Sequence, residues 1–140
     1  MTDPATPPLP GYTIYDAYDP FETRAGPFWW SRLEDGTDHF VLQAAEQHCN
    51  SHGIVHGGLM MTMIDLALVA VSKAETRDRF VTVSLNSEFI SSGRKGDLIE
   101  ARGRLNRRGR SLAFAQGQVT TADRILLTAS AVLKPIHPAG

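Results

Sequence analysis

The spacing of apolar and polar positions divides the chain into a helical part and a β part. Residues 59–74 contain neither Gly nor Pro and consist mostly of Leu, Met, Ala and Val, which predicts a helix of about four turns. This helix is apolar on nearly every side, so we expect it to be buried. After residue 79, apolar and polar residues alternate, beginning with Val81-Thr82-Val83-Ser84, which is typical of strands.

Six runs of strand length accompany this helix. Four follow it, at residues 81–86, 98–105, 111–120 and 125–133, and two precede it as a hairpin, at residues 28–33 and 39–45. We therefore predict an α+β fold in which an antiparallel sheet, with the last four strands as a meander, wraps one long central helix. Because one helix leaves the sheet edges open, we expect copies of the chain to pair through an edge strand.

The length of the chain, 140 residues, suits one domain. We place this domain at residues 28–140, after an extended, proline-rich arm and an irregular lead-in at residues 1–27, where one short helical turn is expected. The net charge of -1 gives no electrostatic reason to expect nucleic acid or an anionic membrane as a partner. The single cysteine, Cys49, and the lack of a signal peptide favour the cytoplasm.

The segment from His48 to Gly58 is a loop rich in His, Asn, Ser and Gly, and it leads directly into the helix. Gly57 and Gly58 open that helix, where backbone N–H groups have no intrahelical partner and the helix dipole favours negative charge. Glycine also lacks the Cβ that would block a close approach. This end of the helix is therefore a candidate oxyanion hole for acyl transfer.

Asp65 is the only charged residue of the predicted helix before Lys73. A buried carboxylate without a partner is costly, so Asp65 either accepts hydrogen bonds from a nearby Ser, Thr or backbone group, or faces a cavity and acts there. Gly57 and Asp65 lie about 12 Å apart along a helix, a gap that an aspartate side chain cannot cover. If both act on one carbonyl group, the site has to lie between two chains.

A motif of the loop and helix resembles a known family. It reads Asn50-x-x-Gly53-x-x-His56-Gly57-Gly58, with Asp65 seven residues later, and is followed by Gly96-Asp97, by Arg108 to Phe114 and by Ala129-x-Ala131. This pattern, spread over residues 28–134, resembles the hotdog-fold acyl-CoA thioesterases of the phenylacetate-degradation (PaaI-like) branch. The resemblance implies hydrolysis of an acyl-CoA to a free acid and CoA, and an assembly of two dimers with shared active sites.

The resemblance also implies roles for individual residues. Asp65 would be the general base or the nucleophile, and the Gly57 N–H would polarise the thioester carbonyl. Asn50 would hold that carbonyl or the attacking water, and His56 would support the loop or hydrogen-bond the substrate. Thr82 would place a hydroxyl near the water, although strand alternation alone also puts a hydroxyl on that face.

Five residues are candidates for binding the substrate or its CoA part: Gly58, Arg94, Lys95, Arg108 and Arg110. For any one of the basic residues, a solvated turn charge is the alternative interpretation. Together they suit the phosphates of CoA.

Other assignments remain open or are not favoured. A non-catalytic acyl-CoA-binding module on the same fold is the main alternative, while a hydratase would need a different acid–base pair around its histidine. His48, Cys49 and His52 have no further ligand nearby to complete a metal site, so no metal or cofactor is expected. The sequence does not determine the acyl group.

Overall fold

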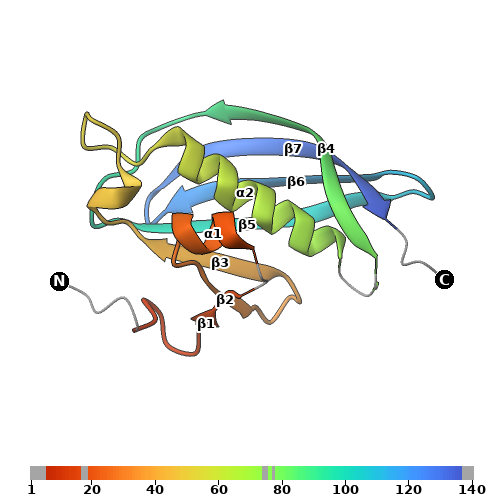
Figure 1. Ribbon diagram of the computed structural model, residues 1–140, viewed down its shortest axis with the longest axis horizontal. Coiled ribbons are helices and arrows are strands. Elements are labelled where there is room, and N and C mark those ends of the chain that lie inside the picture. Colours follow the sequence, from red (N-terminus) through yellow and green to blue (C-terminus); the bar gives the residue numbers. More distant parts are fainter. Residues whose placement is uncertain (1–5, 17–18, 74–75, 77, 137–140) are drawn as a thin grey trace.

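The computed structural model describes residues 6–16, 19–73, 76 and 78–136. A seven-stranded antiparallel sheet curves around one long helix, α2 (Gly57–Ser72), and a short helix, α1 (Pro20–Ala25), packs against α2 (Figure 1). The strands are β1 (Thr13–Ile14), β2 (Trp29–Arg32), β3 (Asp38–Gln43), β4 (Arg79–Phe89), β5 (Leu98–Arg108), β6 (Ala113–Thr121) and β7 (Arg124–Ile136), and a 3-10 turn, η1 (Glu46–His48), precedes α2. The predicted α+β architecture is confirmed.

The strand order, β1-β2-β3-β5-β6-β7-β4, corrects one prediction. A four-strand meander would pair β4 with β5, but β4 pairs with β7, and β5 pairs with β3. The reason is that α2 crosses the sheet between β3 and β4, so the chain leaves the helix at the opposite edge. After β4 the chain returns to the other side of the sheet, where β5 pairs with β3, and β5, β6 and β7 then form a meander. Among the strands that the structure describes, β4 pairs only with β7 and is therefore an edge strand.

The predicted elements agree with the observed ones in type, with shifts at their ends. The hairpin before the helix is β2 and β3, and the short helical turn of the lead-in is α1. Asp19 caps α1, because its carboxylate accepts a hydrogen bond from the Glu22 N–H at 3.0 Å. The long helix begins at Gly57, as the two glycines before the apolar run of residues 59–74 predicted, and Ala74, the last residue of that run, lies outside the described residues.

One face of α2 packs tightly onto the sheet, and glycines make this possible. A Cβ atom on Gly103 would lie 2.6 Å from Leu68 Cδ2, and one on Gly117 would lie 2.9 Å from Ile64 Cδ1. The opposite face of α2 is only half-buried and carries Asp65. The expectation of a helix buried on nearly every side is therefore wrong for this face.

The edge strand β4 exposes apolar side chains. Val81 and Val83 are 45% and 58% exposed, whereas Phe80, on the opposite face of the strand, is buried. A β-bulge interrupts the β4–β7 register between Thr82 and Ser84. Exposed valines on an unpaired edge strand suit the expected contact with another copy.

The N-terminal arm is attached to the sheet through a buried histidine. The Tyr12 hydroxyl lies 2.5 Å from His39 Nδ1, and the two rings meet edge to face. His39 Nε2 lies 3.0 Å from Glu100 Oε1. Burial lowers the pKa of His39, and the charge of Arg102 lowers it further.

This buried histidine is expected to make stability depend on pH. The unfolded chain has the ordinary His pKa of about 6.5, so it binds more protons than the folded chain just below that pH. His39 therefore reduces stability as the pH falls through about 6.5. Thermal denaturation should show a larger loss of Tm between about pH 7.5 and 5.5 for the wild type than for His39→Gln. Equal losses in the two proteins would contradict this role.

Candidate active site

The loop before α2 is organised by Asn50. Its side-chain oxygen accepts hydrogen bonds from the backbone N–H groups of His52, at 2.9 Å, and Ile54, at 3.4 Å. The Asn50 N–H donates to the Ile54 carbonyl at 2.8 Å, and Gly53 turns the loop with a φ of 75°. Because the loop uses the oxygen of the Asn50 amide, its NH₂ group is the part suited to bind a substrate oxygen.

At the N-terminus of α2, the backbone N–H groups of Gly57 and Gly58 differ in how far the protein itself uses them. His56 is the N-cap, and its Nδ1 accepts a hydrogen bond from the Gly58 N–H at 2.8 Å. No hydrogen bond from the Gly57 N–H occurs among the described residues. Among the described residues, the Gly57 N–H is thus open to a ligand, while the Gly58 N–H and His56 Nδ1 bond to each other at the start of the helix.

Asp65 and Thr82 lie 17 positions apart in the sequence and meet in the fold. The Thr82 hydroxyl, from β4, donates to Asp65 Oδ1 at 2.5 Å, and both residues are half-buried. This hydrogen bond satisfies one carboxylate oxygen, which is what the first alternative from the sequence, a purely structural carboxylate bonded to a nearby Ser, Thr or backbone group, predicts. It also orients the carboxylate, and no hydrogen bond to the second oxygen occurs within the part of the chain that the structure describes.

The structure does not bring Gly57 close to Asp65. Both belong to one continuous helix, from Gly57 to Ser72, so they are separated by about 12 Å along its axis. Asn50 and His56 lie with Gly57 at the N-terminal end, and Thr82 lies with Asp65 at mid-helix. One chain therefore contains two separate halves of the predicted site.

Two of the candidate CoA-binding residues, Arg94 and Lys95, adjoin the motif loop. Arg94 forms a β-bridge with Ile54, and the Val55 N–H donates to the Gly93 carbonyl at 2.8 Å. Both basic side chains are exposed. They are positioned to meet a charged group that approaches the loop.

The other two candidates, Arg108 and Arg110, belong to the β5–β6 hairpin at the far end of β5, about 35 Å of extended strand away. The Arg108 guanidinium donates to Asp78 Oδ2 at 2.6 Å and lies 4.6 Å from the centre of the Phe80 ring. Arg110 is exposed. The four basic residues therefore do not form one patch on a single chain.

The extra histidine and cysteine beside the motif are held by the protein itself. His48 Nδ1 accepts from the Ala45 N–H, and its Nε2 donates to the Gly26 carbonyl, both at 2.9 Å. Cys49 Sγ lies 3.5 Å from the Ala45 carbonyl oxygen. Because both ring nitrogens are used, His48 has a structural role. In the part of the chain that the structure describes, no three His, Cys, Asp or Glu side chains are placed to hold a metal ion.

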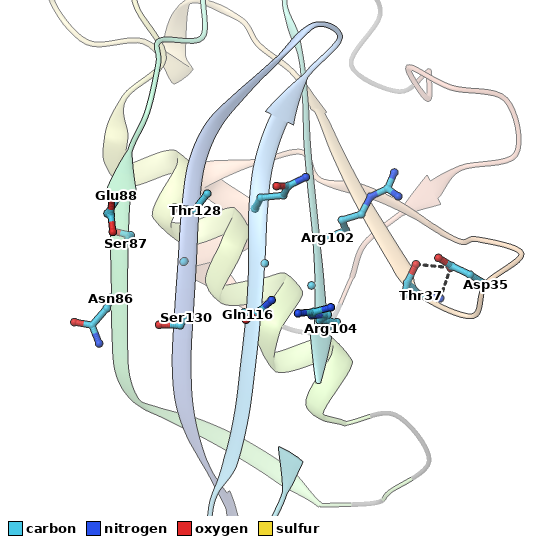
Figure 2. A pocket seen from close by; sticks show the side chains of 14 residues that line it. Asp35, Thr37, Asn86, Ser87, Glu88, Arg102, Arg104, Gln116, Thr128 and Ser130 are labelled. Atoms are coloured by element: carbon cyan, nitrogen blue, oxygen red, sulfur yellow. Dashed lines mark hydrogen bonds between the residues drawn. The ribbon is translucent and has the colours of Figure 1, made fainter. Parts of the chain in front are cut away.

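A concavity of about 660 Å³ lies on the face of the sheet that points away from α2 (Figure 2). Its polar lining comes from β4, β5, β6 and β7 and from the β2–β3 turn, and includes Asn86, Glu88, Arg102, Arg104, Gln116, Gln118, Thr128 and Ser130. Its lining contains neither Asp65 nor any residue of the loop before α2. In the sequence, the polar residues that alternate along these strands already indicated that one face of the sheet is not part of the core.

One residue near the site was not among the sequence candidates. Glu22, on α1, has its pKa raised to about 7, chiefly by burial and then by the negative charges of Asp19 and Asp65, while Lys73 lowers it. The motif could not identify Glu22, because its burial and the influence of the Asp65 charge on it arise only when α1 packs on α2.

No helix among the described residues has the length and apolarity to cross a membrane.

A helix wrapped by an antiparallel sheet, with a glycine-opened N-terminus and a mid-helix carboxylate, defines the class of hotdog-fold thioesterases. Residues 52–128, more than half of the chain, match the family described as Thioesterase superfamily. This chain belongs to the thioesterase superfamily and is a thioester hydrolase.

Individual relatives agree with this assignment. The chain is 34% identical over 110 residues to Putative esterase PA0474 of Pseudomonas aeruginosa, covering 76% of this chain and 81% of the relative. It is 31% identical over 80 residues to acyl-coenzyme A thioesterase 13 of Mus musculus, covering 56% and 57%. The E. coli PaaI protein from the phenylacetic acid degradation operon has the same fold, with a TM-score of 0.77 at 15% identity over 85% of this chain and 86% of that one.

Proposed function

We propose that this chain hydrolyses an acyl-CoA thioester to a free acid and CoA, with Asp65 as the reacting carboxylate. The observation that carries the proposal is the Asp65–Thr82 hydrogen bond on the half-exposed face of α2, in a chain of the thioesterase superfamily. The mouse relative named acyl-coenzyme A thioesterase 13 supports CoA as the thiol part of the substrate.

The chemistry follows from the free oxygen of Asp65. This oxygen either takes a proton from water as that water attacks the thioester carbon, or attacks the carbon itself to form an anhydride that water then opens. In both cases, electrons move onto the carbonyl oxygen, where the Gly57 N–H and the Asn50 NH₂ group would stabilise them. Collapse of this intermediate breaks the C–S bond and releases the CoA thiolate, which then takes up the proton that the attacking water loses, so that Asp65 is again a carboxylate.

The complete site requires two chains. The reacting carbon has to lie within about 3–3.5 Å of its attacker while its oxygen meets the oxyanion donors, and about 12 Å separates these groups in one chain. Two antiparallel α2 helices related by a two-fold axis would place Gly57 of one chain beside Asp65 of the other. The unpaired edge of β4, with exposed Val81, Val83 and Phe89, supports this contact.

A second contact would join two such dimers through the polar face of the sheet. Arg102, Gln118, Thr128 and Glu88 form one row across β5, β6, β7 and β4. If two copies meet face to face about an axis along the strands, Arg102 of one lies opposite Glu88 of the other. Light scattering that gives the mass of a dimer at micromolar concentration would rule out this second contact.

The function is tested by thiol release. Purified protein is mixed with a panel of aryl-acetyl, aryl-carboxyl and medium-chain acyl-CoAs, and free CoA is detected with DTNB. Turnover of at least one substrate is expected. Tight acyl-CoA binding without thiol release would indicate the non-catalytic module instead.

Removal of the charges beside the motif loop should weaken substrate binding. The double variant Arg94→Ala, Lys95→Ala is expected to raise KM for the best acyl-CoA about 5- to 10-fold and to leave kcat unchanged, because a remote phosphate contact acts equally on substrate and transition state. The effect should shrink in high salt, which screens exposed charges. Arg110→Ala tests separately whether the basic residues of the β5–β6 hairpin contribute to KM. An unchanged KM in low salt would leave Arg94 and Lys95 as solvated turn charges.

A further inference from the structure

The aromatic ring of Phe89 lies against the first residue of α2. A Cβ atom on Gly57 would lie 2.9 Å from Phe89 Cε1, 3.2 Å from Cζ and 3.8 Å from Cδ1, so the ring occupies the space that any other side chain at this position would enter. Phe89 is the last residue of β4, which runs back along α2 (Figure 1), and it is 56% exposed. The ring therefore offers an apolar surface beside the N-terminal end of the helix.

A second contact joins β4 to the same face of α2. The Ser87 hydroxyl lies 2.9 Å from Met61 Sδ. Ser87 and Phe89 are two residues apart on a strand, and Gly57 and Met61 are four residues apart on a helix, so each pair lies on one face of its element. The half-buried Met61 thioether therefore extends the apolar surface of the Phe89 ring along α2, away from the motif loop.

The ring is also close to the Gly57 N–H group. The amide nitrogen and the Cβ atom of a residue are about 2.5 Å apart, because both are bonded to Cα. Phe89 Cε1 is therefore at most about 5.4 Å from the Gly57 nitrogen. A carbonyl oxygen that accepts a hydrogen bond from this N–H lies about 2.9 Å from the nitrogen. An acyl chain bonded to that carbonyl carbon starts close enough to pack on the ring.

The two sides of Gly57 differ in polarity. Arg94 and Lys95 are exposed cations next to the motif loop. On the β4 side lie the Phe89 ring and the Met61 thioether. An acyl-CoA has the same asymmetry, because its phosphates are charged and a hydrocarbon acyl group is not. The charged end of CoA thus fits the loop side, and an apolar acyl group fits the β4 side.

We propose that Phe89 is a specificity-determining residue, which packs against the acyl group and favours aryl or medium-chain acyl groups over acetyl. This inference rests on the proposed acyl-CoA hydrolysis, with Gly57 as oxyanion donor, and adds the class of acyl group. A phenyl ring has only two rotatable side-chain bonds, so it supplies a large apolar area at a low cost in entropy. A long or aromatic acyl group covers this area, whereas an acetyl group covers little of it.

The test compares kcat/KM for acetyl-CoA with kcat/KM for the best aryl or medium-chain acyl-CoA of the substrate panel. Phe89→Ala should lower the value for the larger substrate about 10-fold and change that for acetyl-CoA by less than about 2-fold, because only the larger group loses apolar contact. Phe89→Leu keeps an apolar side chain and should give an intermediate value. Phe114→Ala is the control, because it makes the same change on the face of the sheet that points away from α2, where Phe114 is 37% exposed. It should retain the wild-type ratio.

The ratio of the two kcat/KM values decides the result. Circular dichroism and light scattering check that each variant keeps the fold and the dimer. An unchanged ratio in Phe89→Ala would overturn the proposal, whether both values fall or neither does. If both fall equally, the ring acts on the CoA part, on the oxyanion donor or on the contact between chains, and not on the acyl group.

A binding measurement separates this inference from the proposed function. Asp65→Asn lacks the reacting carboxylate, so its binding of acyl-CoA can be measured by calorimetry without turnover. Adding Phe89→Ala to this variant should raise Kd for the larger acyl-CoA about 10-fold and leave Kd for acetyl-CoA unchanged. If the wild type releases no thiol from any acyl-CoA, the proposed hydrolysis fails, and the Kd values alone decide the role of Phe89. The same Kd for the larger acyl-CoA in both variants would overturn that role.

Discussion

Asp65→Asn is expected to lower kcat for acyl-CoA hydrolysis by about 10²- to 10⁴-fold, the usual cost of removing a general base, and by more if Asp65 is the nucleophile. The amide has nearly the same shape and can still accept the hydrogen bond of Thr82, so the fold should be retained. Thiol release measures the rate, and circular dichroism checks the fold.

Two further variants sharpen this result. Asp123→Asn makes the same chemical change in an exposed turn and should keep the wild-type kcat. Thr82→Val removes the hydroxyl that orients the carboxylate and should lower kcat less than Asp65→Asn, by about 10-fold or somewhat more, since a hydrogen bond to a charged group is worth roughly 1.5–3 kcal/mol. Near wild-type turnover in Asp65→Asn would show that Thr82 and Asp65 form a structural pair only.

The second large effect is the recovery of activity from two inactive variants. Gly57→Val should be inactive, because its side chain blocks the oxyanion end of α2. A Cβ atom at this position would lie 2.9 Å from Phe89 Cε1, at the far end of a side chain and not against the backbone, so a small turn of the ring can make room and the fold can be kept. Asp65→Asn retains the oxyanion end and lacks the carboxylate.

A mixed dimer of these variants contains one wild-type site and one site with both defects. Random exchange of subunits makes about half of the dimers mixed, so about a quarter of full activity should return. Each variant incubated alone through the same exchange is the control and should stay inactive. Mass spectrometry of differently tagged subunits confirms the exchange. If no activity returns after confirmed exchange, the two residues do not act together across a dimer interface.

The sequence alone was enough for the elements whose signals are local. An unbroken run of Leu, Met and Ala defines α2, and alternation defines β4 to β7, because both periods are set by backbone geometry within a few residues. Asp65 stood out as the one charge within that apolar run. Helix geometry then separated Gly57 from Asp65, which made a shared site an inference from the sequence.

Only the tertiary structure decided how distant segments combine. The order β7-β4 at the sheet edge depends on where α2 delivers the chain, and no local pattern records this. The hydrogen bond from Thr82 to Asp65 follows from that order, because it places β4 beside the half-exposed face of α2. The raised pKa of Glu22 likewise arises chiefly from burial, then from Asp19 at the start of α1 and from Asp65 on α2, and the sequence around α1 records neither the burial nor the charge of Asp65. Contacts of this kind depend on packing between elements far apart in the chain, so the surroundings of Asp65 and Glu22 were decided by the fold.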